Sequence, residues 1–257
     1  MQARRFTGER WAVAGACVLA ALGAVAAAGC SGSEDDWVVR PPGGGPGGGT
    51  HPDGGTSVDA SSGGNGRLCV VDDLRAPDAC PATADVAGVR VRVEDGPTVT
   101  TDANGRFDLS LAQAAIVDVG ETTATLVPGV SRVEPGGPIA VRAMHVEPFD
   151  DLLLAVGGPP LTQGAIAIYV EEQAGGPAQD VSFDQLGGAT FPVLYDAGGA
   201  TSWQTDAGTG AAGVALMLDV PAGSYTLTGT VPGSSPFTIT EVPVRAGALT
   251  FVRRALP

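Results

Sequence analysis

The chain lacks lysine altogether and carries few basic residues of any kind. Its 257 residues include 14 basic side chains, all of them arginine, against 28 Asp and Glu, so the formal net charge is −14. Counterion-release binding to nucleic acid needs cations clustered on a basic face, and this composition therefore excludes a nucleic-acid partner. Lysine Schiff-base chemistry is excluded with it. The acidic balance is typical of a solvated, outward-facing surface.

Histidine is also scarce, which limits both catalysis and metal binding. The chain has only His51, in a Gly/Pro-rich segment, and His145, in a strand-like segment where a lone histidine usually packs or faces solvent. A catalytic zinc generally needs three protein ligands, commonly histidines, and the chain has no G-x-S-x-G elbow and no P-loop motif. We therefore expect no catalytic residue, no metal site and no cofactor, and predict that the protein is not an enzyme.

Adjacent acidic residues are the remaining candidates for weak calcium binding. Three pairs could chelate a cation if loops brought them together: Asp72-Asp73, Asp150-Asp151 and Glu171-Glu172. The segment Asp102-Ala103-Asn104-Gly105 is similar to part of a calcium loop, but the alignment places Leu111 where the loop needs a glutamate. Solvated acidic faces are the more common explanation, so no metal site is assigned.

The N-terminus has the features of an export signal. A positive region, with Arg4, Arg5 and Arg10, precedes an uncharged run over residues 11–28. The run is just long enough to span a bilayer, but it is half alanine, which adds little insertion energy. Residues 1–29 are therefore predicted to be a cleaved signal peptide, and a permanent transmembrane helix is the alternative.

The end of this signal resembles the lipobox of bacterial lipoproteins. The residues Ala27-Ala28-Gly29-Cys30 are small and end in a cysteine, although the family favours leucine at the position of Ala27. The resemblance implies cleavage before Cys30 and a lipid on its thiol, and two or more acyl chains give stable anchoring. Ser31, where some bacteria read aspartate as an inner-membrane mark, favours the outer membrane. An ordinary signal with an incidental Cys30 is the alternative.

The remaining cysteines predict a disulfide. Cys17 lies in the signal and Cys30 would carry lipid, which leaves Cys69 and Cys80. An even pair in an oxidising compartment is expected to form a bond, and this one would stabilise the fold by about 2–3 kcal/mol because it constrains the unfolded chain. A metal site is the alternative, but two thiolates with no nearby histidine make a poor zinc set.

Residues 30–66 are predicted to be a disordered tether. Glycine and proline dominate this segment, and it contains too little apolar surface to offset the entropy lost on ordering. A flexible chain of this length spans roughly 33 Å, which is enough to hold a domain clear of lipid headgroups.

The rest of the chain has the pattern of an all-β protein. Short apolar or alternating runs are separated by Gly, Pro, Asn and Asp, as in antiparallel sandwiches. The segments predicted to be strands are 89–93, 107–111, 139–146, 165–171, 214–220, 225–231, 237–244 and 249–253. Only residues 110–119 have a pattern compatible with a helical turn or two. The length suits two sandwiches, and the breaker cluster at 157–160 divides them into modules 67–157 and 158–257.

Two local patterns resemble the carboxypeptidase regulatory-like domain, a transthyretin-like (prealbumin-like, Ig-like) β-sandwich. Residues 87–91 and 101–109 are similar to the family's GV-x-V strand and TD-x-NG-x-F hairpin, and residues 219–227 are similar to its V-P-A-G-x-Y turn and final strand. The resemblance implies two transthyretin-like antiparallel modules. It implies no activity, because fold does not fix function and the zinc-binding domain of metallocarboxypeptidases has no counterpart here. Residues 110–160 follow the family pattern poorly.

Trp203 is the one candidate ligand contact. It is the single Trp after the tether and lies between polar neighbours; sandwich domains often bind sugars on exposed aromatic side chains, and capping of a sheet edge is the alternative. We predict a non-catalytic, lipid-anchored cell-envelope protein that binds a protein or glycan partner. The alternatives are an accessory subunit of an envelope enzyme or transporter, and a hydrolase with an unrecognised site that would have to use His145.

Overall fold

The computed structural model describes residues 65–256 except for short gaps at 82–83, 121–122, 159, 185, 187–191, 197–201 and 206. The predicted signal peptide, Cys30 and the predicted tether up to residue 64 lie outside these residues and stay predictions. The described residues all belong to one compact unit, Val58–Pro257. Among them, no helix is both long enough and apolar enough to cross a membrane.

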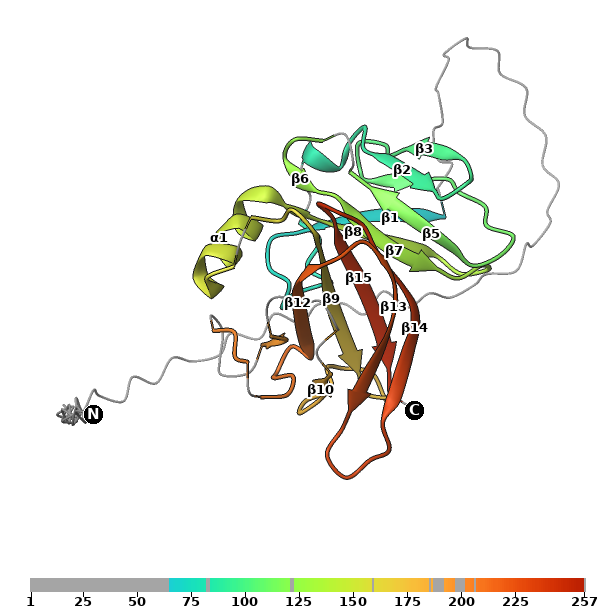
Figure 1. The fold of residues 1–257 in the computed structure, drawn as a ribbon. Coiled ribbons are helices and arrows are strands. Elements are labelled where there is room, and N and C mark those ends of the chain that lie inside the picture. The colour runs from blue at the N-terminus through green and yellow to red at the C-terminus, as the bar shows by residue number, and fades with distance from the viewer. Residues whose placement is uncertain are drawn as a thin grey trace, which may run out of the picture. The chain divides into compact units, whose positions relative to one another are not determined.

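The predicted all-β fold is confirmed, with fifteen strands and a single α-helix among the described residues (Figure 1). The strands of the first half are β1 (Gly66–Val71), β2 (Arg90–Val93), β3 (Thr98–Thr100), β4 (Arg106–Phe107), β5 (Ala115–Val119), β6 (Leu126–Val127), β7 (Gly129–Val133) and β8 (Ile139–His145). Those of the second half are β9 (Gly164–Glu171), β10 (Ser182–Phe183), β11 (Leu194–Tyr195), β12 (Val214–Val220), β13 (Gly223–Thr230), β14 (Phe237–Val244) and β15 (Leu249–Ala255). The helices are the 3-10 helix η1 (Ala84–Val86) and α1 (Val146–Val156).

Sequence patterns located most long strands but misplaced the helix. β12 and β14 have the predicted bounds, whereas only the first residue of the predicted strand 107–111 lies in a strand. Residues 110–119 contain no helix, because β5 takes their second half and buries Val117 and Val119. The helix is α1, which ends at Gly157 with the left-handed φ of 68° that glycine tolerates well.

The strands form three sheets, and the first and last long strands of each half lie side by side. The sheet orders are β4-β1-β8-β6, β10-β13-β14 and β11-β12-β9-β15-β7-β5-β2-β3. Most neighbours are antiparallel, as predicted, but β1–β8, β9–β15 and β7–β15 are parallel. A parallel pair requires a crossover connection. Within each half, the segment that connects the two parallel strands contains strands that belong to the opposite sheet.

The two halves repeat one pairing order. In the first half β4-β1-β8 packs against β2-β5-β7, and in the second half β12-β9-β15 packs against β10-β13-β14. The eight-stranded sheet arises because β7 of the first half pairs with β15 of the second, with Gly129 opposite Leu249. The predicted boundary at residue 157 falls between α1 and β9, and this sheet runs across it. The module limits stay a prediction.

A buried threonine holds the same turn in each half. In the first half, the Val89 N–H donates to Thr101 Oγ1 at 2.9 Å, and the Thr101 hydroxyl donates to the carbonyl three residues before that valine at 2.5 Å. In the second half, the Val181 N–H donates to Thr209 Oγ1 at 3.1 Å, and the Thr209 hydroxyl donates to the carbonyl three residues earlier at 2.7 Å. The hydrogen-bond pattern therefore repeats along with the strand order.

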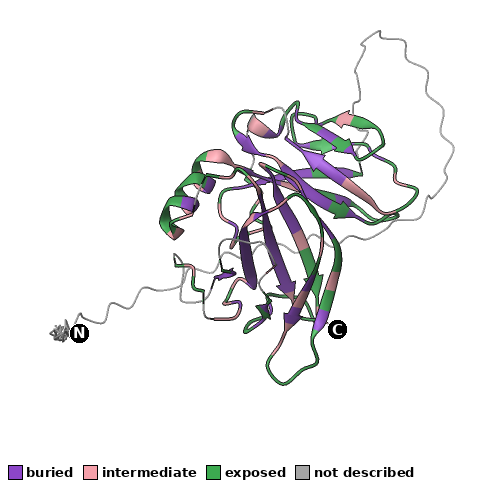
Figure 2. Cartoon of the chain, in the orientation of Figure 1, coloured by how far each residue is buried: buried purple, intermediate pink, exposed green. Residues whose placement is uncertain are grey.

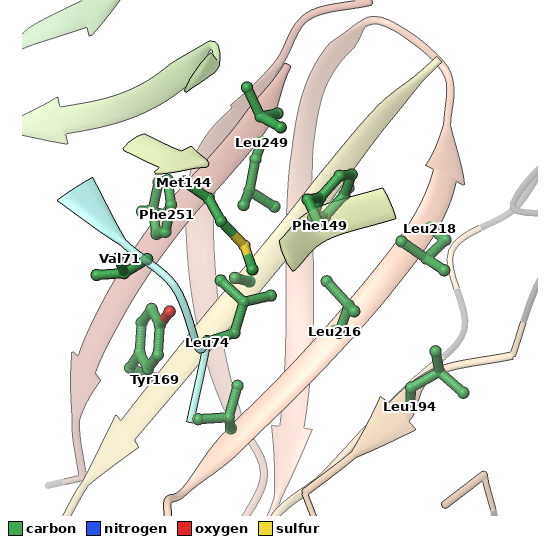
Figure 3. Packing of buried hydrophobic residues seen from close by; sticks show 14 of the residues in the cluster. Val71, Leu74, Met144, Phe149, Tyr169, Leu194, Leu216, Leu218, Leu249 and Phe251 are labelled. Atoms are coloured by element: carbon green, nitrogen blue, oxygen red, sulfur yellow. The ribbon is translucent and has the colours of Figure 1, made fainter. Parts of the chain in front are cut away.

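Three hydrophobic cores hold the sheets together, and long strands such as β9 and β12 consist mostly of buried residues (Figure 2). Two of them lie inside the individual halves, where Leu68 of β1 and Ile168 of β9 are buried. The next residues, Cys69 and Tyr169, point to the opposite faces of these strands and into a third core. This shared core consists of Cys69, Val71, Leu74, Val127, Met144, Phe149, Leu153, Ala165, Ala167, Tyr169, Leu194, Val214, Leu216, Leu218, Leu249 and Phe251 (Figure 3). Because β1 and β9 are buried on both faces, the halves pack as one body.

Candidate functional site

Three segments depart from the pairing order that the halves share, and they meet at one cavity. They are the loop 72–80 after β1, the helix α1, and the stretch between β10 and β12 that carries Trp203. The cavity has a volume of about 310 Å³, and apart from Met144 every described residue that lines it belongs to one of these segments. Binding residues concentrate on loops that a rigid scaffold positions. We therefore take this space, the Trp203 cavity, as the candidate site.

The loop 72–80 is fixed to the sheets by a covalent bond and by ion pairs. Cys69 and Cys80 form the predicted disulfide. Asp78 accepts hydrogen bonds from Arg142 at 2.8 Å and from Arg253 at 2.6 Å. Burial favours the neutral carboxyl of Asp78, but the two guanidinium groups outweigh it and lower the pKa of Asp78 below its usual value. The loop is thus tied to β1, β8 and β15.

Trp203 is half-buried at the cavity, with an arginine over its ring. The guanidinium carbon of Arg75 lies 5.9 Å from the ring centroid, within the range of a cation–π interaction. Asp73 holds the arginine there by hydrogen bonds of 2.9 Å to Nε and 3.2 Å to Nη2. The Trp203 ring also packs against the shared core. Trp203 therefore joins the core to the cavity, and its contact with a ligand stays a prediction.

His145 lies at the end of β8, directly before α1, between two carboxylates. Its Nδ1 is 2.5 Å from Asp72 Oδ1, and its Nε2 is 3.2 Å from Asp85 Oδ2. Both ring nitrogens therefore lie within hydrogen-bond distance of a carboxylate. Local pattern predicted the strand around His145 but not its carboxylates, because Asp72 and Asp85 lie far from it in the sequence.

The acidic pairs do not form a metal centre in the described part of the chain, where no three His, Cys, Asp or Glu side chains gather closely enough to hold an ion. Arginines neutralise two of their members: Asp73 contacts Arg75 at 2.9 Å, and Glu171 contacts Arg253 at 3.1 Å. Asp151 lines the Trp203 cavity. These carboxylates therefore serve as ion-pair partners or as part of the cavity wall.

Comparisons with known proteins leave the family open. No family model and no curated protein matches the chain, so the resemblances to lipoproteins and to the carboxypeptidase regulatory-like domain stay predictions. Among solved structures, the Bacillus anthracis TIE protein is 15% identical with a TM-score of 0.21, over 74% of this chain and 32% of its own. A Streptococcal ancillary pilin is 13% identical with a TM-score of 0.20, over 75% of this chain and 62% of its own. This chain thus spans less than two thirds of either, and such scores support no functional conclusion.

Proposed function

We propose that this protein is a non-catalytic glycan-binding protein of the bacterial cell envelope. The observation that carries the proposal is the Trp203 cavity, where an indole ring lies with three carboxylates and a guanidinium group. Small-molecule pockets combine apolar or aromatic surface with a few polar groups that fix orientation. A sugar matches this combination, because its C–H face packs on an aromatic ring while its hydroxyls bond to carboxylates and guanidinium groups.

The charge of the cavity indicates which glycans it accepts. Asp72, Asp73 and Asp151 line it, against the single cation of Arg75. An acidic ligand would place like charges side by side, which disfavours binding. The Trp203 cavity is therefore suited to neutral or amino sugars rather than to uronic or sialic acids.

The surroundings of His145 support binding without catalysis. A general base needs a ring nitrogen within hydrogen-bond reach of the proton that it removes. Asp72 and Asp85 lie within hydrogen-bond distance of the two ring nitrogens of His145, so this histidine links the loop 72–80 and η1 to β8.

A glycan array tests the binding function. The full mature chain should bind neutral or amino glycans, and Trp203→Ala should weaken binding about tenfold or more because the aromatic surface is lost. Asp151→Asn should also weaken binding. Asp150→Asn is the matched control, since it removes the same charge from the neighbouring helical position outside the cavity.

Two array results would overturn the binding function. One is a wild-type protein that binds no glycan and is instead retained by a protein partner. The other is a Trp203→Ala variant that binds glycans as tightly as the wild type.

Attachment to the membrane through Cys30 is the second part of the proposal, and the pattern Ala27-Ala28-Gly29-Cys30 supports it. Intact mass spectrometry of protein extracted from bacterial membranes should give a chain that begins at Cys30 and carries acyl groups. Cys30→Ser should release the protein from the membrane, because the acyl chains supply the anchoring energy. An unmodified mature N-terminus would contradict this part while leaving glycan binding intact.

A further inference from the structure

Two residues that line one further cavity each carry a buried polar atom without a hydrogen-bond partner. Among the described residues, these orphaned atoms are Arg75 Nη1 and Tyr169 Oη. Both residues line a space of about 480 Å³ beneath the loop 72–80, next to β9 and β15. We call it the Tyr169 cavity. Arg75 also lines the Trp203 cavity, so the two cavities are neighbours that share one side chain.

Tyr169 is part of the shared core, yet its hydroxyl has no hydrogen-bond partner among the residues that the structure describes. The side chain is 2% exposed, and its ring stacks on Phe251 with 6.5 Å between centroids. It lies beside the segment that runs from Val71 to Leu74 (Figure 3). Burial raises the pKa of Tyr169 above its usual value, so the hydroxyl keeps its proton at neutral pH and can donate a hydrogen bond. A buried donor without an acceptor is unfavourable, and most such groups in native proteins have a partner or a role.

The chemistry around this hydroxyl defines the missing partner. Both orphaned groups can donate a hydrogen bond, and the guanidinium nitrogen of Arg75 can do nothing else, so the partner must offer an acceptor oxygen. The charges that line the Tyr169 cavity already balance, because Arg75 and Arg253 lie there with Asp78 and Glu171. A neutral acceptor therefore fits better than an anion. The hydroxyl of a sugar is such an acceptor, and it can donate to the cavity's carboxylates at the same time.

We propose that the Tyr169 cavity is a second sugar subsite, so that a glycan of two or more residues runs across Arg75 from the Trp203 cavity. This inference rests on the proposed function. Neither orphaned atom is open to solvent in the free protein, so the segment 76–79 moves outward when a sugar hydroxyl reaches Tyr169. The disulfide holds the base of the loop during this movement, and the contacts of Asp78 with Arg142 and Arg253 resist it.

Removal of a single oxygen atom tests the subsite. Tyr169→Phe should weaken binding of neutral di-, tri- and tetrasaccharides on an array of hexoses and N-acetylhexosamines about tenfold, and so reduce their advantage in affinity over monosaccharides. The melting temperature of the free variant should stay the same or rise, because the variant no longer buries an unsatisfied donor. Tyr225→Phe is the matched control, since the Tyr225 hydroxyl donates to the Pro221 carbonyl at 2.8 Å, away from both cavities.

The outcomes separate the subsite from the proposed function. Binding that depends on Trp203 but is unaffected by Tyr169→Phe overturns the subsite alone, and so does monosaccharide binding as tight as that of a trisaccharide. A lower melting temperature of Tyr169→Phe also overturns it, because the hydroxyl then has a water partner. A wild-type protein that binds no glycan overturns the proposed function, and the subsite with it.

Discussion

The two halves of the folded chain share a scaffold but differ in the loops that they add to it. Each half pairs its first and last long strands in parallel and ties a turn with a buried threonine. β1 continues into the disulfide-closed loop 72–80, whereas β9 continues into a tight turn in which the Glu172 N–H donates to the Gly176 carbonyl. The repeated hydrogen bonds thus belong to the scaffold that both halves share, whereas the loop 72–80, which occurs in one half only, lines both cavities.

The largest expected effect comes from the core that the halves share. Phe149→Ala should lower the free energy of unfolding by about 3–5 kcal/mol, because it opens a cavity at a side chain that is 1% exposed. Phe107→Ala, in the core of the first half alone, is the matched substitution. Denaturant unfolding should show one transition that both variants shift. Two separate transitions, with Phe107→Ala moving only one, would mean that the halves fold independently.

The disulfide should contribute the next largest effect, and it exists in one half only. Replacing Cys69 and Cys80 together with serine should cost about 2–3 kcal/mol, because the loop is no longer constrained in the unfolded chain. Thermal unfolding with and without reductant measures the same loss in the wild type. The double variant is the control, since reductant should leave it unchanged. A wild-type melting temperature that is insensitive to full reduction would refute the contribution.

Substitutions at the two threonine turns test whether the repeated hydrogen bonds contribute to stability in both halves. Thr101→Val and Thr209→Val should each cost about 1–3 kcal/mol, because each leaves a buried valine N–H without its acceptor. Serine at the same positions keeps the hydroxyl and should recover most of the loss. Chemical denaturation compares the four variants. If only one of the two valine variants loses stability, the hydrogen-bond pattern repeats in geometry but not in its contribution to stability.

The smallest expected effects have opposite signs in the two halves. Gly88 and Asp180 both precede the valine of the threonine turn, with φ of 72° and 59°. A Cβ atom at Gly88 would meet nothing within 4 Å, so Gly88→Ala should cost about 1 kcal/mol through the left-handed backbone alone. Asp180→Gly should gain up to about 1 kcal/mol for the same reason. If Gly88→Ala and Asp180→Gly shift the melting temperature in the same direction, the two positions are not equivalent.

Sequence patterns succeeded where the signal lies in adjacent residues. The alternation in residues 89–93 and the short runs 214–220 and 237–244 predicted strands because alternation and apolar runs are both visible in a short window. The helix α1 was missed because its start signal is absent: His145 at the N-cap makes no side-chain capping bond. Trp203 was found as a candidate because it is a lone Trp, but the arginine over its ring was not.

By itself, the sequence determined that the chain forms many short strands, where most of its turns fall and which cysteines pair. Those properties depend on alternation, turn chemistry and a count of thiols, which are all local or compositional. Only the tertiary structure decided that β7 pairs with β15, that Arg75 lies over Trp203 and that Tyr169 is buried without a partner. Such contacts join segments that are distant in the sequence through the packing of sheets, and they produce no periodic pattern in the sequence.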